Sequence, residues 1–120
     1  MKTKNLWESF HHAFDGLMHC IRHERNIRIH LTMGCLALIL AVALSVKPIE
    51  LVVLVLIIAA VIVSEMINTA IENVIDLVSP EFHPLAKIVK DITAGAVLFS
   101  CIAAVIIGCL IFIPYLWALL

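Results

Sequence analysis

The sequence has few of the residues from which nucleotide-binding domains build a phosphate loop. Only four glycines occur, far apart in the chain, and no G-x-x-x-x-G-K-[ST] motif is found. The glycines are Gly16, Gly34, Gly95 and Gly108. A glycine-rich loop that cradles phosphates is therefore excluded, so any nucleotide would have to be bound by helix side chains and a metal ion.

Paired cysteines are also missing. The four cysteines show no C-x-x-C spacing, and Cys35, Cys101 and Cys109 lie within apolar segments. Cysteines in such surroundings behave as small hydrophobic residues, so no structural disulfide is expected. No feature of the sequence indicates nucleic-acid binding.

Charge is scarce, and long segments contain none. Charged residues make up 14% of the chain and apolar residues 63%, and the mean hydropathy is +1.13. These values are typical of a membrane protein. Residues 31–46, 51–64 and 92–120 contain no Asp, Glu, Lys or Arg. The first two segments are shorter than the roughly 20 residues of a membrane-spanning helix, but both can be extended by neighbouring residues.

The expected architecture is an all-α membrane protein with one domain over residues 1–120. Prolines help to set the helix ends. Lys47-Pro48 suits the short turn between the first two spans and Pro84 suits a helix start, whereas Pro80 and Pro114 are expected to end a helix. The prediction is an amphipathic surface helix followed by three transmembrane helices, over residues 5–23, 29–47, 50–78 and 84–113. The last two would extend into the cytosol.

Residues 5–23 carry an apolar stripe with helical spacing. It consists of Leu6, Trp7, Phe10, Ala13, Phe14, Leu17, Met18 and Ile21. The aromatic residues favour a helix lying on the inner membrane surface. Packing of the same stripe on the other helices is an equally open interpretation.

Basic residues predict the orientation in the membrane. Only Lys47 lies between the first and second spans, and the other seven lie before the first span or between the second and third. The positive-inside rule therefore places the N-terminus and residues 77–91 on the cytoplasmic side. Lys2 and Lys4 are not followed by an apolar segment, so no signal peptide is expected.

The stretch EMINTAIENVID, residues 65–76, carries a row of polar side chains. Glu65, Asn68, Glu72 and Asp76 share one helix face, at spacings of i, i+3, i+7 and i+11. A helix end facing water would explain Asp76. It would not explain Glu65, which would lie about 21 Å along a helix entering a bilayer roughly 30 Å thick. A functional role is therefore expected for Glu65.

These residue types fit phosphoryl chemistry. A pair of carboxylates suits Mg²⁺, which is usually held by one or two carboxylates together with substrate phosphates. An acid that is partly removed from water takes up a proton more readily, which suits a general base.

Two further charged clusters leave alternatives open. In HERNIRIH, residues 23–30, Glu24 could pair with Arg28 or could reach the acids of the second span. Lys87 and Lys90, with Asp91, could neutralise phosphates or could be cytoplasmic anchors.

Several histidines invite a zinc hypothesis. His12, His19, His23 and His30 would share a face if one helix ran through all of them. A turn before the first span would separate His30 from the others.

The chain resembles the prokaryotic diacylglycerol kinase and undecaprenol kinase family of small membrane lipid kinases. The family signature E-x-x-N-[ST]-A-[IV]-E-x-x-x-D is matched by residues 65–76. Glu81-Phe82-His83, Lys90-Asp91, Gly16 and Glu24 also match. The resemblance covers nearly the whole chain.

The resemblance implies specific roles. Glu65 would be the general base for the lipid hydroxyl, supported by Asn68 and Asp76, and would meet the lipid together with Arg28. Glu24 and Glu72 would hold Mg²⁺ on ATP. The nucleotide would be contacted by Glu24, Glu72, Glu81, His83, Lys90 and Asp91. The protein would be a homotrimer in which catalysis is mostly positioning and charge neutralisation.

The resemblance also implies a substrate. The stretches ERNIRIHL and HPLAKIVKDITAGAVL look like the Gram-positive branch, whose members mainly phosphorylate undecaprenol. Asn5 stands where the diacylglycerol-preferring branch has an arginine implicated in substrate binding. We therefore expect undecaprenol as the substrate and undecaprenyl phosphate as the product, with diacylglycerol as the alternative.

Two other classes of protein remain as alternatives. A small cation or drug/proton antiporter also uses an intramembrane acid, but it would not need acids running into the cytosol with lysines facing them. A non-catalytic assembly subunit would need neither Glu65 nor Glu72.

Overall fold

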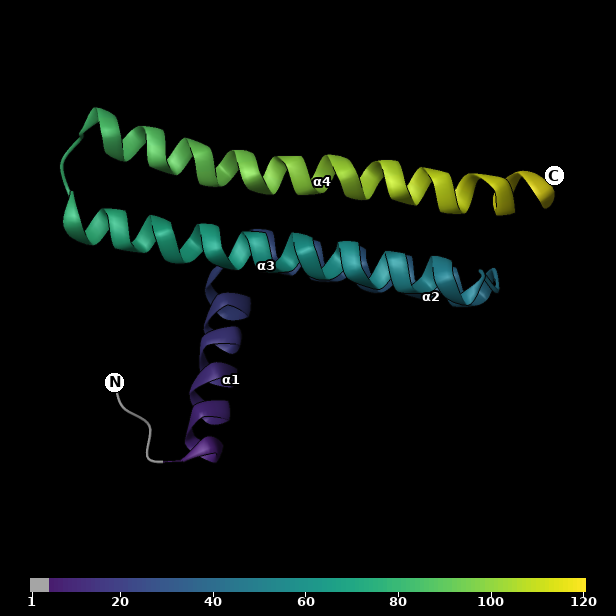
Figure 1. Ribbon diagram of the computed structural model, residues 1–120, viewed down its shortest axis with the longest axis horizontal. Coiled ribbons are helices and arrows are strands. Elements are labelled where there is room, and N and C mark those ends of the chain that lie inside the picture. The colour runs from purple at the N-terminus through teal and green to yellow at the C-terminus, as the bar shows by residue number, and fades with distance from the viewer. Residues whose placement is uncertain (1–4) are drawn as a thin grey trace.

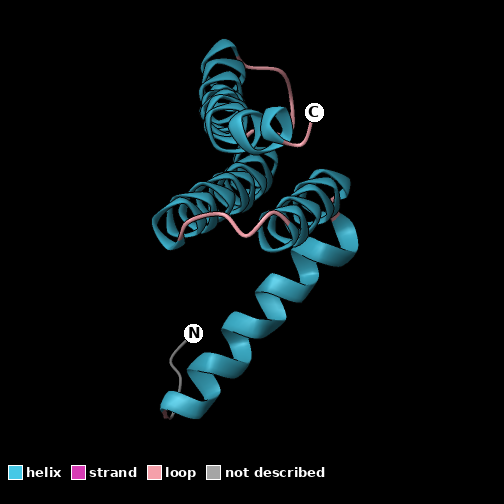
Figure 2. Ribbon diagram, turned by 90° about the vertical axis from the view of Figure 1, so that its right-hand side faces the viewer, coloured by secondary structure: helices cyan, strands magenta, loops and turns pink. Residues whose placement is uncertain are grey.

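A computed structural model describes residues 5–120 as four α-helices joined by short connections (Figure 1). The helices are α1 (Leu6–His23), α2 (Arg25–Ala43), α3 (Pro48–Val78) and α4 (Pro84–Ala118). Helix α3 packs against both α2 and α4, and α1 projects away from these three helices (Figure 2). Lys2 and Lys4, used above to predict orientation, lie outside the described residues.

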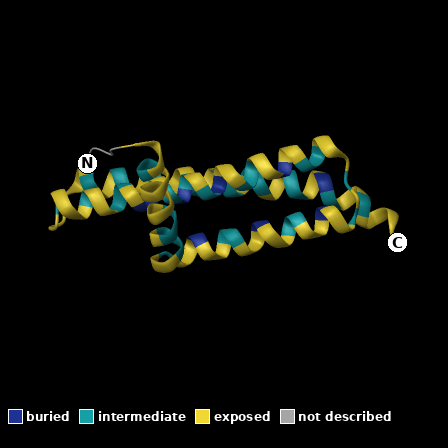
Figure 3. Ribbon diagram, turned by 90° about the horizontal axis from the view of Figure 1, so that it is seen from below, coloured by how far each residue is buried: buried dark blue, intermediate teal, exposed yellow. Residues whose placement is uncertain are grey.

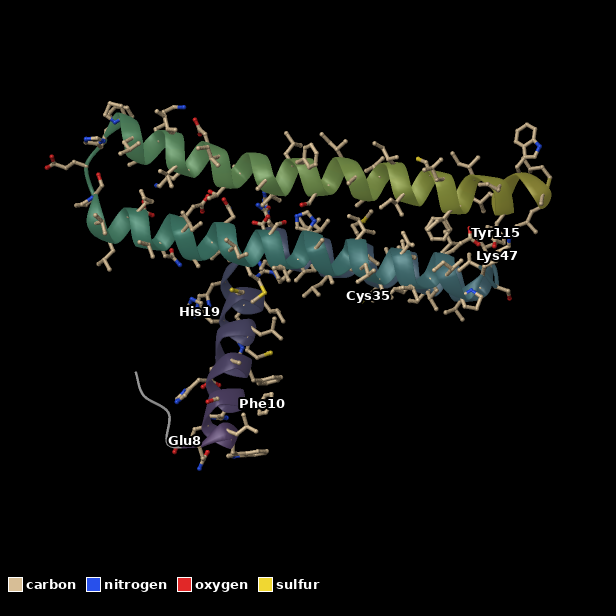
Figure 4. All side chains as sticks on the ribbon, viewed as in Figure 1. Glu8, Phe10, His19, Cys35, Lys47 and Tyr115 are labelled. Carbon is tan, nitrogen blue, oxygen red and sulfur yellow. The ribbon has the colours of Figure 1, made fainter. Side chains whose placement is uncertain are left out.

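Three of these helices, α2, α3 and α4, are long and apolar enough to cross a membrane. Together with the helix at the N-terminus they confirm the expected all-α membrane fold. The first helix has no buried residue, and Trp7 and Phe10 are 80% and 64% exposed. Glu8 and Phe10 point to opposite sides of α1 in Figure 4, which is the amphipathic arrangement that the sequence predicts.

The chain bends at Glu24, where α1 ends and α2 begins. The guanidinium of Arg28 reaches back across this bend, and its Nη1 donates hydrogen bonds to the carbonyl oxygens of Ile21 and Arg22, at 2.9 and 3.0 Å. These contacts satisfy carbonyls that a helix end leaves without partners. Arg28 thus binds the end of α1 rather than pairing with Glu24 in the described chain.

The first membrane helix lies earlier in the sequence than expected. Helix α2 spans Arg25–Ala43 instead of residues 29–47. Helix α2 starts earlier than expected because a single residue, Glu24, forms the bend after α1. No loop of several residues separates the two helices. Its end precedes a turn in which Ser45 has a φ of 53°, in the left-handed region where an α-helix cannot continue.

The expectation that Pro114 ends the last helix is wrong. Helix α4 continues through Pro114 to Ala118. Proline removes one backbone donor, but such a loss is tolerated in membrane helices when neighbouring groups hold the segment. The Tyr115 hydroxyl donates to Glu50 at the start of α3 and accepts from the backbone N–H of Lys47 at 3.2 Å. Figure 4 shows Lys47 and Tyr115 together at this end of the helix pair.

The buried interior is small. Its apolar members are Ile27, Ala41, Leu54, Val61 and Ile111. Most of the helix surface is exposed in the single chain (Figure 3), which leaves wide apolar faces for lipid or for other copies of the chain.

Helices α2 and α3 approach each other closely at Gly34. A Cβ atom placed on Gly34 would lie 2.7 Å from Cγ2 of Ile58. The glycine therefore sets the spacing between the two helices that carry the central polar residues described next.

Candidate active site

Helix α3 carries a row of polar residues that runs from the buried interior to its exposed end. Glu65 is 3% exposed and Asn68 is 7% exposed. One turn further Glu72 is half-buried, and Asp76 is exposed. The sequence predicted this face from helical spacing, and the exposure of its side chains rises from Glu65 to Asp76.

Glu65 has a basic partner from another helix. The Nε2 atom of His30 on α2 lies 3.7 Å from Oε2 of Glu65, and the two side chains are 23% and 4% exposed. A buried carboxylate is costly unless a charge or hydrogen bond compensates it. His30 is therefore the neighbour best placed to stabilise the charged form of Glu65.

Asn68 links the buried end of the row to the half-buried Glu72. Its Nδ2 donates to Oε1 of Glu72 at 3.2 Å, while its Oδ1 is buried without a hydrogen-bond partner. An unsatisfied buried acceptor costs about 1–3 kcal/mol. This oxygen is thus available for a donor or a cation supplied by a ligand.

A second cluster lies at the connection between α3 and α4. It surrounds a cavity of about 370 Å³. Its charged and histidine lining consists of Asp76, Glu81, His83, Lys87, Lys90 and Asp91. Five of these six were predicted as site residues. Lys87 was recognised in the sequence only as one of two lysines with an open role.

Ion pairs order this second cluster. Lys90 on α4 pairs with Asp76 on α3 at 2.5 Å, and Lys87 pairs with Asp91 one turn along α4 at 2.6 Å. His83 caps α4, because its Nδ1 accepts from the backbone N–H of Leu85 at 3.1 Å. The cavity thus presents both acids and lysines held in fixed positions.

An apolar cavity of about 380 Å³ lies between α2, α3 and α4. His30 and Cys101 line it, together with aliphatic residues and Phe112 at the far end. Oε2 of Glu65 lies 3.7 Å from Nε2 of His30. The cavity is open on one side and suits a hydrocarbon chain whose polar end lies near this pair.

Among residues 5–120, no hydrogen bond or ion pair links the predicted residues Glu24 and Arg28 to these clusters. Glu24 lies at the bend between α1 and α2, and Arg28 is engaged by the end of α1. Within residues 5–120, no three His, Cys, Asp or Glu side chains come close enough together to hold a metal ion. The zinc hypothesis is therefore unsupported, because α1 ends at His23 and His30 belongs to another helix.

The oxygen chemistry nevertheless fits magnesium. Glu72 supplies a carboxylate. Asn68 donates through its Nδ2 to this carboxylate and supplies an Oδ1 that has no hydrogen-bond partner. Both are hard oxygen ligands of the kind that Mg²⁺ prefers, and this ion usually takes few protein ligands.

The contact of His30 with Glu65 was missed in the sequence. His30 was visible within HERNIRIH, but only as part of the zinc hypothesis. The signal that could have indicated this contact is that a buried acid needs a basic neighbour. The rotation of α2 against α3, which selects His30, is not encoded in any local pattern.

Taken together, fold and site define a small helical membrane protein in which a buried acid is connected to a charged cavity at one end of a helix pair. Comparison with known proteins gives the family. Residues 11–112 match the family described as prokaryotic diacylglycerol kinase. The chain belongs to this family of lipid kinases.

Relatives with two different names match the chain. An undecaprenol kinase of Bacillus subtilis is 40% identical, over 96% of this chain and 94% of that protein. A diacylglycerol kinase of Synechocystis is 42% identical, over 97% of this chain and 67% of that protein. A diacylglycerol kinase of Escherichia coli is 37% identical, over 83% of this chain and 82% of that protein. The resemblance noted in the sequence is thereby confirmed.

Proposed function

We propose that the protein transfers the γ-phosphoryl group of ATP to the hydroxyl of a membrane lipid alcohol, and that this alcohol is undecaprenol. The observation that carries the proposal is the placement of Glu65. It is a buried carboxylate beside an apolar cavity, at the inner end of a polar row that leads to a charged, water-accessible cavity. Along α3, Glu65 and Asp76 are separated by about 16 Å at 1.5 Å per residue.

Each end of this row suits one substrate. The apolar cavity accommodates part of the hydrocarbon chain, which leaves the hydroxyl near Glu65. The charged cavity between α3 and α4 receives the nucleotide, where Lys90 and Lys87 counter phosphate charge. Glu81, His83 and Asp91 line the same cavity and contact the remainder of the nucleotide.

The reaction follows from these positions. Glu65 accepts the proton of the lipid hydroxyl as the oxygen attacks the γ-phosphorus, and the bond to ADP breaks. Asn68 keeps Glu72 in place through its Nδ2, and Asp76 fixes Lys90. Mg²⁺, held by Glu72 with Glu24 and the phosphates, would neutralise charge on the nucleotide.

The protein would act as a homotrimer in the bacterial cytoplasmic membrane, with its N-terminus and site facing the cytoplasm. The small interior and wide exposed apolar faces support association. The distribution of basic residues supports this orientation. Arg28 can still meet a lipid headgroup, because only one of its nitrogen atoms binds the end of α1.

Undecaprenol is favoured because the undecaprenol kinase of Bacillus subtilis matches almost end to end, at 40% identity. Diacylglycerol is the second candidate, because the Synechocystis relative carries that name at 42% identity. Membership of a lipid kinase family gives no support to the hypothesis of an antiporter or to that of a non-catalytic subunit.

The test is transfer of labelled γ-phosphate from MgATP by purified protein in mixed micelles. Undecaprenol and diacylglycerol are offered separately and in competition. Glu65→Gln should lose transfer, whereas Glu50→Gln, on the same helix, should keep it. Preference for undecaprenol supports the proposal, and preference for diacylglycerol overturns the substrate. No transfer to either lipid by folded protein would overturn the kinase assignment.

A further inference from the structure

We propose that His30 is a positioning residue that holds the Glu65 carboxylate towards the lipid hydroxyl. The inference rests on the proposed function of Glu65 as the base. It concerns a residue from a different helix, to which neither the family signature on α3 nor the roles proposed above assign a part.

The first observation is that His30 contacts both the apolar cavity and Glu65. His30 lines this cavity, whereas Glu65 does not. Its Nε2 is 3.7 Å from Oε2 of Glu65. A hydroxyl arriving from the cavity therefore meets the imidazole and the carboxylate together.

The second observation is the scarcity of other partners. Among the described residues, His30 is the only basic side chain within 4 Å of the Glu65 carboxylate. The other titratable groups facing Glu65 are the Cys101 thiol from α4 and Glu72, two turns away on α3. Neither is a basic side chain, so the imidazole is the described group best placed to orient that carboxylate.

The chemistry of imidazole fits this role. A neutral imidazole with its proton on Nε2 orients the carboxylate and leaves it able to accept the hydroxyl proton. An imidazolium would hold the carboxylate in an ion pair and weaken it as a base. In this step the pair gains one proton, the one that Glu65 takes from the lipid hydroxyl.

The contact depends on close packing of the two helices. His30 lies one turn before Gly34 on α2, and Gly34 lets α2 approach Ile58 of α3. The position of His30 is therefore fixed by the helix pair and not by a mobile loop.

The experiment measures kcat and KM for ATP and for the lipid across pH 5.5–8.5 in four variants. His30→Ala removes the imidazole. His30→Gln places an uncharged amide nitrogen near the position of Nε2. Glu65→Gln tests the base itself, and His12→Gln, on the exposed α1, is the matched control. Thermal unfolding of each variant establishes that it is folded.

We expect His30→Ala to lower kcat about 10- to 100-fold, part of the roughly 10²–10⁴-fold contribution of a general base, with KM for ATP unchanged. His30→Gln should recover most of kcat, because its amide nitrogen can still approach the Glu65 carboxylate. His12→Gln should match the wild type.

Two results separate the inference from the proposed function. Wild-type kcat in His30→Ala, or a His30→Gln variant that recovers none of the lost kcat, overturns the role of His30 while Glu65→Gln remains inactive. Retained transfer in Glu65→Gln would instead overturn the base on which the inference rests.

Discussion

Lys90 has a partner from a different helix. It pairs with Asp76 of α3, whereas Lys87 pairs with Asp91 of its own helix. An ion pair between two helices fixes both the lysine and the end of the polar row. The proposal therefore assigns Lys90 a larger part in nucleotide binding than Lys87.

Lys90→Gln should lower kcat/KM for ATP about 10- to 100-fold, the range expected for losing a hydrogen bond to a charged group. Stability should fall by no more than about 1 kcal/mol, because the side chains of Lys90 and Asp76 are 39% and 64% exposed. Steady-state kinetics and thermal unfolding measure the two effects. Lys47→Gln, at the opposite end of α3, is the matched control, and an unchanged kcat/KM in Lys90→Gln would refute the assignment.

Sequence reasoning worked within one helix and failed between helices. Glu65, Asn68, Glu72 and Asp76 could be placed on one face because the helical repeat fixes their relative directions. The partnership of Glu65 with His30 depends on how α2 is rotated and spaced against α3. That rotation is set by packing, as at Gly34, and leaves no periodic signal in the chain.

At the scale of elements, Gly34 controls the distance between α2 and α3. A Cβ atom added to Gly34 would lie 2.7 Å from Cγ2 of Ile58, a distance shorter than any normal contact between carbon atoms. The atom it would meet is a methyl group on a β-branched carbon, which has little freedom to move aside.

Gly34→Ala should therefore separate the helices and destabilise the protein by about 1–3 kcal/mol, with loss of activity as His30 moves from Glu65. Ile58→Ala removes the obstructing methyl group and should restore part of the loss in the double variant. Thermal unfolding and transfer assays measure both effects.

The control for Gly34→Ala is Gly95→Ala, since a Cβ at Gly95 meets nothing within 4 Å. This control should be neutral or slightly stabilising, because alanine favours a helix. Wild-type stability and activity in Gly34→Ala would contradict the close approach of α2 and α3.

The element boundaries show where sequence patterns are less reliable. Uncharged segments predicted three long helices because a membrane span requires them. They could not predict that α4 continues past Pro114, where Tyr115 is bound to Glu50. Such a tether joins residues far apart in the chain, so no local rule for proline accounts for it.

At the scale of the whole molecule, a single chain leaves much of its apolar surface uncovered. Exposed large side chains occur on both long helices α3 and α4, with Phe99 at 77% and Leu56 at 64%. Lipid covers part of this surface, and the proposed trimer covers more.

The mass of the protein in detergent tests the proposed trimer. We expect about three times the chain mass of 13.3 kDa, after subtraction of bound detergent, measured by light scattering. Transfer activity should follow the trimer on chromatography. An active species with the mass of one chain would refute the assembly.

The central claim is that one helix brings a lipid hydroxyl and a water-soluble nucleotide to opposite ends of a polar row, with Glu65 serving only the lipid end. The most direct test is to measure MgATP binding and phosphoryl transfer in the same preparation of Glu65→Gln. The account predicts unchanged affinity for MgATP and a transfer rate reduced about 10²–10⁴-fold. Transfer near the wild-type rate, or loss of nucleotide binding together with transfer, would contradict it.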